Sequence, residues 1–513
     1  MLTGGGDDMF ADTWRAHWGL REEPFVHEDA DKDPVLARLD SAAVHSSFDR
    51  LYGDPASPVP GVVFGEKGSG KSGLRRTMLR RLEAYNDAHP DARAFLVEYI
   101  DFDPFLESLR RSLNIPGGSK KTTARLLETW TRADHLDAML SLAVTQLVDQ
   151  VVRNAAEAKR FDRKKRRDLV TLAWLYYRSD EQTRGEALVT LQKSLGWFSG
   201  RPMMLQMART VLTVVGVLLL IWPHLGFLGA VIDRFKEWDV RFPALYHGIG
   251  AALVGATWLW TWVTGFLLHG KARKAVHAIR VVPAAARPLA RFLATLPPAA
   301  RGELTLPQGQ EEESRYLLLK RLLGVLRSGG YASMFVLVDR VDESTFLESK
   351  AESMTRFVEP LLEHKLLQFD GMGLKLFLPI ELSRLMTNAS SDELKRMRLD
   401  KANAVQELMW TGQELLSIAN QRLAAAAQSG RNPSLQDLFV SEVSEADIKD
   451  ALQTLGTPRL CFGFLGTLIS EHVRDLPETM PDDDPRWRLP LRLFDIQRSA
   501  WTDRARTQRR TLN

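Results

Sequence analysis

The sequence contains almost no cysteine. Cys461 is the only one in 513 residues, so the chain can form neither an internal disulfide bond nor a zinc site built from several thiolates. This scarcity fits a reducing compartment. Cys461 itself lies in the apolar segment RLCFGFLG, and we expect it to be an inert core residue.

Excess charge of one sign is also missing. The 68 Lys and Arg residues outnumber the 64 Asp and Glu residues by four, and a net charge of +4 is too small to indicate a class of partner. Residues 1–20 lack the apolar core of a cleaved signal peptide, so we expect none. Apolar residues, by contrast, make up 45% of the chain, enough for the cores of several domains.

Asp, Glu, Lys and Arg are absent from two long segments, 210–232 and 243–268. As a helix, the first would rise about 34 Å, enough to cross the roughly 30 Å hydrocarbon core of a bilayer. The second carries three tryptophans within 258–262, and tryptophan is enriched at membrane interfaces. We therefore predict a two-helix transmembrane hairpin over 206–270. The alternative is a helical hairpin buried in a large soluble domain.

Basic residues flank this hairpin and outnumber those of the connecting segment, 233–242, which holds three bases and three acids. The flanking bases are Lys193, Arg201, Arg209, Lys271, Arg273, Lys274, Arg280 and Arg287. Because basic flanks remain in the cytoplasm, we expect a multi-pass protein of the inner membrane, in contact with lipid, with both termini cytoplasmic.

A glycine-rich loop after a short apolar run, 62–64, reads G-E-K-G-S-G-K-S and precedes a helix-forming segment. This spacing fits G-x-x-x-x-G-K-[ST], in which backbone N–H groups at a helix start surround phosphates. Lys71 is then expected to reach the β- and γ-phosphates of ATP, and Ser72 to ligate Mg²⁺. The predicted nucleotide-binding residues are Gly65, Glu66, Lys67, Gly68, Ser69, Gly70, Lys71, Ser72 and Gly73. The alternative is a simple glycine turn before a helix.

A second acidic motif ends the apolar run MFVLVDRVDES, residues 334–344. Ligands of parallel sheets bind at the carboxyl ends of strands, so Asp339 is placed to hold the Mg²⁺ water shell together with Ser72. Asp342 or Glu343 would orient the attacking water. Alternatively, Asp342 caps the next helix.

Three further runs, 94–100, 374–380 and 404–410, have strand length, and the last leads into a T-x-x-E capping box at Thr411. Five strands alternating with helices predict an open α/β sheet, interrupted by a long helical insertion. We predict an N-terminal segment with the first half of the sheet domain (1–103), a helical insertion (104–205) and the membrane hairpin (206–270). A helical return (271–330), the second half of the sheet domain (331–411), a helical lid (412–480) and a basic tail (481–513) follow.

These motifs together resemble P-loop NTPases of the STAND and origin-recognition-like AAA+ groups. Asp339-Arg340-Val341-Asp342-Glu343 is similar to the D-G-h-D-E of NACHT modules, with arginine replacing the glycine. Transmembrane helices inserted between the two nucleotide motifs resemble the layout of KAP-type NTPases. The resemblance implies a membrane-bound ATPase that assembles into homo-oligomers, in families that often act in bacterial defence or signalling.

The resemblance also suggests roles for individual residues. GTPRLCFGFL is similar to a lid segment whose arginine, here Arg459, senses the γ-phosphate; an exposed helix start is the alternative. Pro24 and Phe25 would contact adenine, unless they are plain core residues. Arg396 and Arg398 stand where an arginine finger would lie, or belong to a solvated charge run. The sensor position offers Pro379, Glu381 and Ser383 rather than the usual small polar donor, which leaves slow hydrolysis or mere binding open.

Two basic segments have several interpretations. KRFDRKKRRD, 159–168, fits anionic lipid, nucleic acid or simply an exposed helix face, but lacks the interleaved aromatics that favour base stacking. The arginine-rich tail contains Trp487 and Trp501, a mixture that fits a headgroup layer or a partner helix. The sequence as a whole favours a membrane-anchored ATPase switch with an unknown protein partner. The alternatives are an oligomeric ATP-gated pore or transport component, and a membrane tether for nucleic acid.

Overall fold

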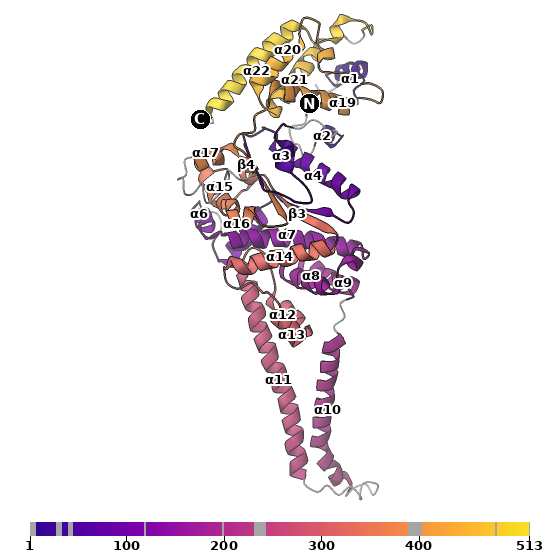
Figure 1. Cartoon of the computed structure of the whole chain (residues 1–513), viewed down its shortest axis with the longest axis vertical. Coiled ribbons are helices and arrows are strands. Elements are labelled where there is room, and N and C mark those ends of the chain that lie inside the picture. The colour runs from indigo at the N-terminus through magenta and orange to yellow at the C-terminus, as the bar shows by residue number, and fades with distance from the viewer. Residues whose placement is uncertain are drawn as a thin grey trace. The chain divides into compact units, whose positions relative to one another are not determined.

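The computed structural model describes residues 7–26, 33–38, 45–116, 120–196, 200–229, 243–387, 403–477 and 480–511 (Figure 1). Two compact units divide the chain. Unit 1 consists of Met1–Asp103 and Gly330–Asn513, and unit 2 of Pro104–Gly329.

Unit 1 contains a sheet of five parallel strands, which confirms the predicted α/β class. The strands are β1 (Gly61–Gly65), β2 (Arg93–Tyr99), β3 (Tyr331–Val338), β4 (Met372–Pro379) and β5 (Asn403–Val405), in the order β2-β3-β4-β1-β5. Every residue of β1 and β4 is buried. Strands covered on both faces read as continuous apolar runs, which is why the sequence revealed them.

The last strand is shorter than predicted. Only Asn403–Val405 pairs with β1, whereas 404–410 was expected to be strand. Beyond it the Leu408 N–H still donates to the Phe64 carbonyl at 2.8 Å, and the Trp410 indole N–H donates to the Ser69 carbonyl at 2.6 Å. The tryptophan thus leaves the sheet to pack on the glycine-rich loop, a tertiary contact that strand propensity cannot reveal.

Some helices of unit 1 pack on the sheet, and others build a separate core. Those of unit 1 are α1 (Asp7–Trp18), α2 (Pro34–Arg38), α3 (Phe48–Tyr52), α4 (Lys71–Ala88), α15 (Ala351–Val358), α16 (His364–Leu367), α17 (Ile380–Thr387), α19 (Gly412–Ala426), α20 (Glu445–Leu455), α21 (Pro458–Arg474) and α22 (Leu491–Thr511). The predicted capping box at Thr411 is present at the start of α19, where its side chain accepts from the Glu414 N–H.

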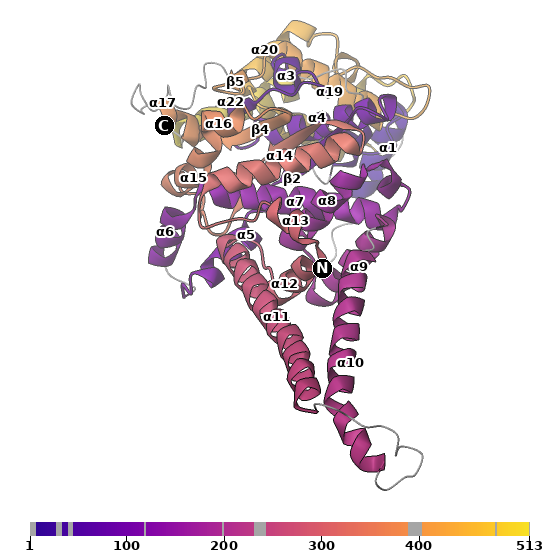
Figure 2. The same ribbon diagram turned by 60° about the horizontal axis from the view of Figure 1, so that its bottom comes forward.

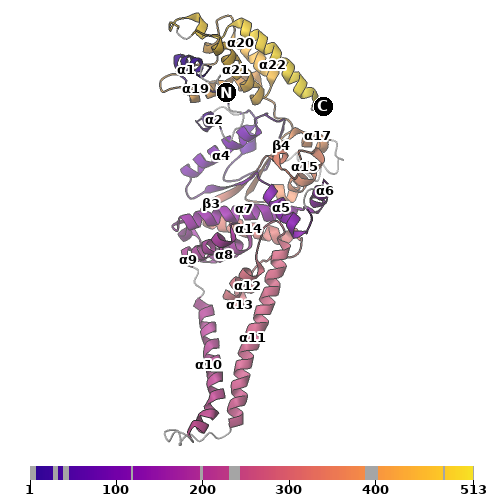
Figure 3. The same ribbon diagram turned by 180° about the vertical axis from the view of Figure 1, so that it is seen from behind.

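Helices α19 to α22 share one apolar core with α1 (Figure 3). Trp14 of α1 is buried there, and its indole N–H donates to the Trp487 carbonyl at 3.0 Å. Trp487 and Trp501 are themselves buried in this core, with Trp501 packed against Gly463. The tail expected to dock on headgroups or a partner helix therefore buries its tryptophans within unit 1.

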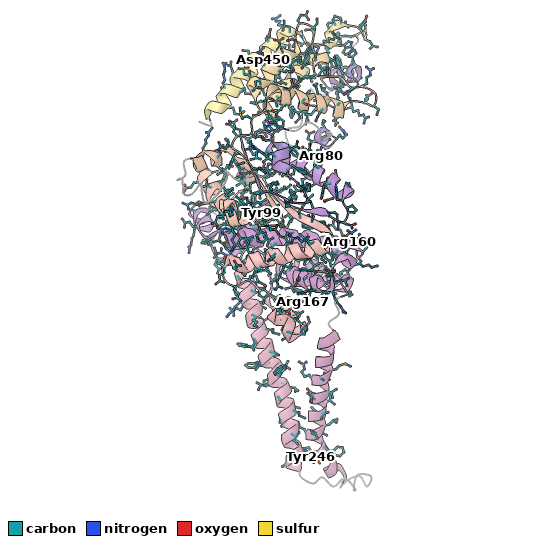
Figure 4. The ribbon with its side chains drawn as sticks, viewed as in Figure 1. Arg80, Tyr99, Arg160, Arg167, Tyr246 and Asp450 are labelled. Atoms are coloured by element: carbon teal, nitrogen blue, oxygen red, sulfur yellow. The ribbon has the colours of Figure 1, made fainter. Side chains whose placement is uncertain are left out.

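Unit 2 is helical. Its elements are α5 (Asp103–Ser112, which starts on the last residue of unit 1), α6 (Lys120–Thr129), α7 (Arg132–Arg153), α8 (Arg163–Tyr176), α9 (Glu181–Ser194), α10 (Gly200–Gly229), α11 (Pro243–Ala278), α12 (Ala286–Thr295), α13 (Pro298–Gly302) and α14 (Glu312–Ser328). Helices α10 and α11 extend away from the bundle side by side (Figures 1 and 2), and Tyr246 marks the far end of α11 (Figure 4).

Among the described residues, one helix, Ala244–Ala278, is long and apolar enough to cross a membrane by length and composition. The apolar part of α10, Met207–Trp222, is shorter. The two helices meet closely at Gly216 and Gly250. A Cβ on Gly250 would lie 2.7 Å from the Gly216 carbonyl oxygen, so the contact requires a glycine.

Two buried ion pairs fix the bundle end of α11. Arg315 of α14 pairs with Asp137 of α7, both fully buried, and donates to the Ala278 carbonyl at 2.6 Å. Arg280, two residues beyond α11, pairs with Asp134 at 2.5 Å. Removing one partner of a buried pair leaves an uncompensated charge, so the helix end is held firmly in the bundle.

We expect Cys461 to be unreactive in the native protein. It is fully buried on α21, and burial raises the pKa of its thiol, whereas only the thiolate is the nucleophile. Ellman's reagent should titrate no thiol in native conditions and one per chain in guanidinium. Native labelling at the rate of a free thiol would contradict the packing of α21.

Candidate functional site

The glycine-rich loop joins β1 to α4. Gly68 and Gly70 have φ of 87° and 94°, a left-handed region that side chains disfavour, so glycine is required at both positions. Gly70 is the N-cap of α4, whose first turn contains no acidic residue. The free N–H groups of this turn and the positive end of the helix dipole favour an anion at the loop.

Lys71 folds back over the loop that precedes it. Its Nζ donates to the carbonyl of Gly65 at 2.6 Å and to that of Glu66 at 3.0 Å. Burial lowers the pKa of Lys71, while the negative charges of Asp342, Asp339 and Glu381 oppose that shift. Three carboxylates from two different strand ends thus act on this one ammonium group.

Ser72 and Asp339 lie far apart in the sequence but are in direct contact. The Ser72 hydroxyl donates to Asp339 Oδ2 at 2.9 Å, and Asp339 Oδ1 accepts the Arg340 N–H at 2.9 Å. Asp339 is 2% exposed at the end of β3, and burial raises the pKa of its carboxyl, with Arg75 and the Ser72 hydroxyl opposing. The structure therefore brings together the two residues that the sequence assigned to one metal ion.

Arg75 was not anticipated from the sequence. It is 1% exposed, its Nε contacts Asp339 Oδ2 at 3.1 Å, and its Nη1 forms an ion pair with Glu98 of β2. Arg75 follows Ser72 by three residues, which places both on one face of α4. The sequence signal that could have revealed its burial is the position of Arg75 beside the apolar residues Leu74 and Met78 of the same helix.

The two remaining acids of the second motif differ in their surroundings. They lie in a short 3-10 turn, Val341–Glu343, rather than in a helix cap, since α15 begins only at Ala351. Asp342 is half-buried and acts on Lys71, whereas Glu343 is exposed and pairs with Arg340 at 3.6 Å. Asp342 is therefore the better placed of the two.

Glu381 occupies the equivalent end of the neighbouring strand. β4 lies between β1 and β3 in the sheet, and its Pro379 is in register with Gly65. Glu381 follows two residues later in the first turn of α17 and is half-buried. The unusual residue at this position is thus a carboxylate near Lys71.

The lid helix α21 starts directly against the glycine-rich loop. The Arg459 N–H donates to the Gly68 carbonyl at 3.3 Å, and a Cβ on Gly68 would lie 2.7 Å from the Cβ of Arg459. Gly70 is similarly close to Pro458 and Trp410, at 3.2 Å each. Arg459 is half-buried at the loop, not on an exposed helix start.

The residues expected to contact adenine lie in the helical core instead. Phe25 is 4% exposed in the helical core and stacks on Phe462 of α21 with ring centroids 6.0 Å apart, and the Pro24 carbonyl accepts from Arg422. This is the core contact that was the alternative to an adenine contact. Arg396 and Arg398 lie outside the described residues.

A scan against protein-family models and searches of curated proteins and of solved structures found no match to this chain.

The contact between Arg75 and Asp339 predicts a stability effect. Arg75→Met would leave the buried carboxylate without its cation, and we expect a loss of about 3–5 kcal/mol. Arg76→Met, which changes the neighbouring half-exposed residue, is the matched control and should change stability far less. Thermal and denaturant unfolding of the full chain in detergent measures both.

A double-mutant cycle separates the pair from general damage to α4. Combined with Asp339→Asn, Arg75→Met should destabilise the protein less than the sum of the two single changes, because the second substitution removes the charge that the first left unpaired. Additive effects would show that the two side chains do not interact.

Proposed function

We propose that this chain is a membrane-anchored ATPase that works as a nucleotide-dependent switch. The observation that carries the proposal is the 2.9 Å contact of Ser72 with Asp339, which joins the glycine-rich loop to the acidic strand end. A phosphate-binding helix start with a neighbouring lysine, hydroxyl and carboxylate is the arrangement of residues that binds Mg²⁺ with a nucleoside triphosphate.

The residues present fit this pair of ligands. No group of three or more His, Cys, Asp or Glu side chains able to hold a metal occurs in the described part of the chain, so the protein alone offers no complete cage. Mg²⁺ does not need one, since it keeps several waters and takes phosphate oxygens beside one or two protein ligands. The buried Ser69 hydroxyl, which has no partner among the described residues, adds an unused polar group inside the loop.

Each residue has a role in this proposal. Bound MgATP would supply the phosphoryl group that is transferred to water. Lys71 and the loop N–H groups bind phosphate oxygens, while Ser72 and Asp339 orient the metal. Asp342 and Glu381 would hold the attacking water, a role supported by the effect of their charges on Lys71. Arg459 connects the lid to the loop, so lid position would depend on the nucleotide.

Membrane insertion of α10 and α11 is the second part of the proposal. The alternative of a buried hairpin would require covered apolar side chains, but Trp258, Trp260 and Trp262 are 68%, 71% and 58% exposed. Apolar surface of this extent on a monomer marks a membrane or a protein partner. We infer two spans with both termini in the cytoplasm, and assembly of several copies in the membrane.

One contact favours the pore as a second candidate. His224 of α10 and His247 of α11 meet with their Nε2 atoms 3.0 Å apart. Ionisable residues within spans often mark ion paths, and a single hairpin encloses nothing, so a pore would require an oligomer. ATP-dependent ion flux into liposomes that contain the purified protein would favour this candidate over a switch without conduction.

Lys71→Ala should abolish ATP turnover while the protein stays in the membrane. Loss of the ammonium group removes charge stabilisation at the phosphates, and we expect a fall in rate of about 100-fold or more. Phosphate release from the purified protein measures the rate, and resistance to alkaline carbonate extraction reports insertion. Unchanged turnover would refute the proposed site.

Substitutions of the three nearby acids separate their roles. Asp342→Asn and Glu381→Gln should each lower kcat by about 100-fold, within the usual range for a group that handles the attacking water. Glu343→Gln is the matched control and should stay close to wild type, because its side chain is exposed and paired with Arg340. A large loss in Glu343→Gln alone would reverse the assignment.

A further inference from the structure

We propose that five bases at the bundle end of α11 bind the anionic headgroups of membrane lipids, an inference that rests on the proposed insertion of α11. All five are exposed, and none has an ion-pair partner within the described ranges. This basic collar consists of Lys271, Arg273 and Lys274 on α11 and Arg287 and Arg291 on α12.

The collar begins where the apolar surface of α11 ends. Phe266 and Leu267 are 68% and 58% exposed, and Lys271 follows Leu267 by four residues, about 6 Å further along the helix axis. Ala272 and Ala275 on the same helix are buried. The bases of α11 therefore lie at the depth at which the hydrocarbon core gives way to headgroups, beside a stripe that packs on protein.

Helix α12 adds two bases to the same level. It lies alongside α11 in all ribbon views (Figures 1 to 3), and its Phe292 stacks on Trp174 of α8 with ring centroids 5.7 Å apart. Leu289 and Leu293 are buried with it. Arg287 and Arg291 are one turn apart on the opposite, exposed face. Packing of the apolar face thus fixes the helix that presents both guanidinium groups.

The basic run 159–168, for which anionic lipid was one predicted ligand, makes many of its contacts within the helical bundle. Arg166 donates to the Phe161 and Leu195 carbonyls, and Arg167, labelled in Figure 4, pairs with Glu303 at 2.8 Å. The run still leaves Arg163 and Lys164 exposed and without an ion pair in the described structure. These two residues provide a matched comparison for the two arginines of α12.

Lipid is favoured over nucleic acid as the ligand of the collar. Base stacking needs exposed aromatic rings, but Phe292, the one Phe, Tyr or Trp in 269–296, is buried. Clustered bases next to a membrane span are the pattern that attracts anionic lipid. The collar is continuous with the exposed apolar surface of α11. We therefore propose a lipid bilayer, rather than nucleic acid, as its ligand.

The test titrates the full-length protein in neutral detergent with dioctanoylphosphatidylglycerol and, separately, with dioctanoylphosphatidylcholine. We expect tighter binding of the phosphatidylglycerol. Arg287→Gln with Arg291→Gln should weaken that binding about 25-fold, since each base near an anionic surface contributes about fivefold. Phosphatidylcholine binding should not change. The control pair, Arg163→Gln with Lys164→Gln, lies on α8 outside the collar. Its binding should therefore stay within about twofold of wild type.

Equal losses in the two pairs, or equal binding of the two lipids, would overturn the proposal. So would a DNA duplex that binds through Arg287 and Arg291 and displaces the lipid. Carbonate extraction of wild-type membranes separates this failure from that of the proposed function. A protein that resists extraction but shows no lipid preference refutes the collar alone, whereas an extracted protein refutes the insertion and the collar together.

Discussion

The buried carboxylate of Asp339 constrains the rest of unit 1. A charge with so little exposure is stable only beside a cation and hydrogen-bond donors, which Arg75 and the Ser72 hydroxyl supply from one face of α4. Satisfying it requires α4 and β3 to pack in one register, although β4 separates β1 from β3 in the sheet. The same register leaves the end of β4, with Glu381, between the loop and the acidic motif. The need to neutralise the Asp339 carboxylate thus brings together the carboxyl ends of β1, β3 and β4.

The elements nearest this contact were predictable because their signals are local. Buried strands appear as apolar runs, and the left-handed turns at Gly68 and Gly70 need glycine whatever the surrounding fold. The partners of these residues were not predictable. Arg75 with Glu98, and Trp410 with the Ser69 carbonyl, join residues through tertiary contacts that leave no periodicity in the sequence. The position of Phe25 in the helical core depends on such a contact as well.

Charge patterns were the least reliable guide. A run of bases signals a solvated or ligand-binding surface only if the fold leaves it unpaired, and Arg166 and Arg167 instead bond within the bundle. The tryptophans of the tail, expected at a surface, complete the core of α19 to α22. In both segments the residue types are evident from the sequence, but partners such as Glu303 for Arg167 and Trp14 for Trp487 lie far away in the chain.

The order of the chain has a consequence for biogenesis. Ser72 is made early, while Asp339 follows only after the whole of unit 2 has been translated. At about 5–20 residues per second, a ribosome needs roughly 15–50 s to reach the second residue from the first. During that interval α10 and α11 have already left the ribosome. A nascent chain can therefore form the contact between Ser72 and Asp339 only after its most apolar helices have been synthesised.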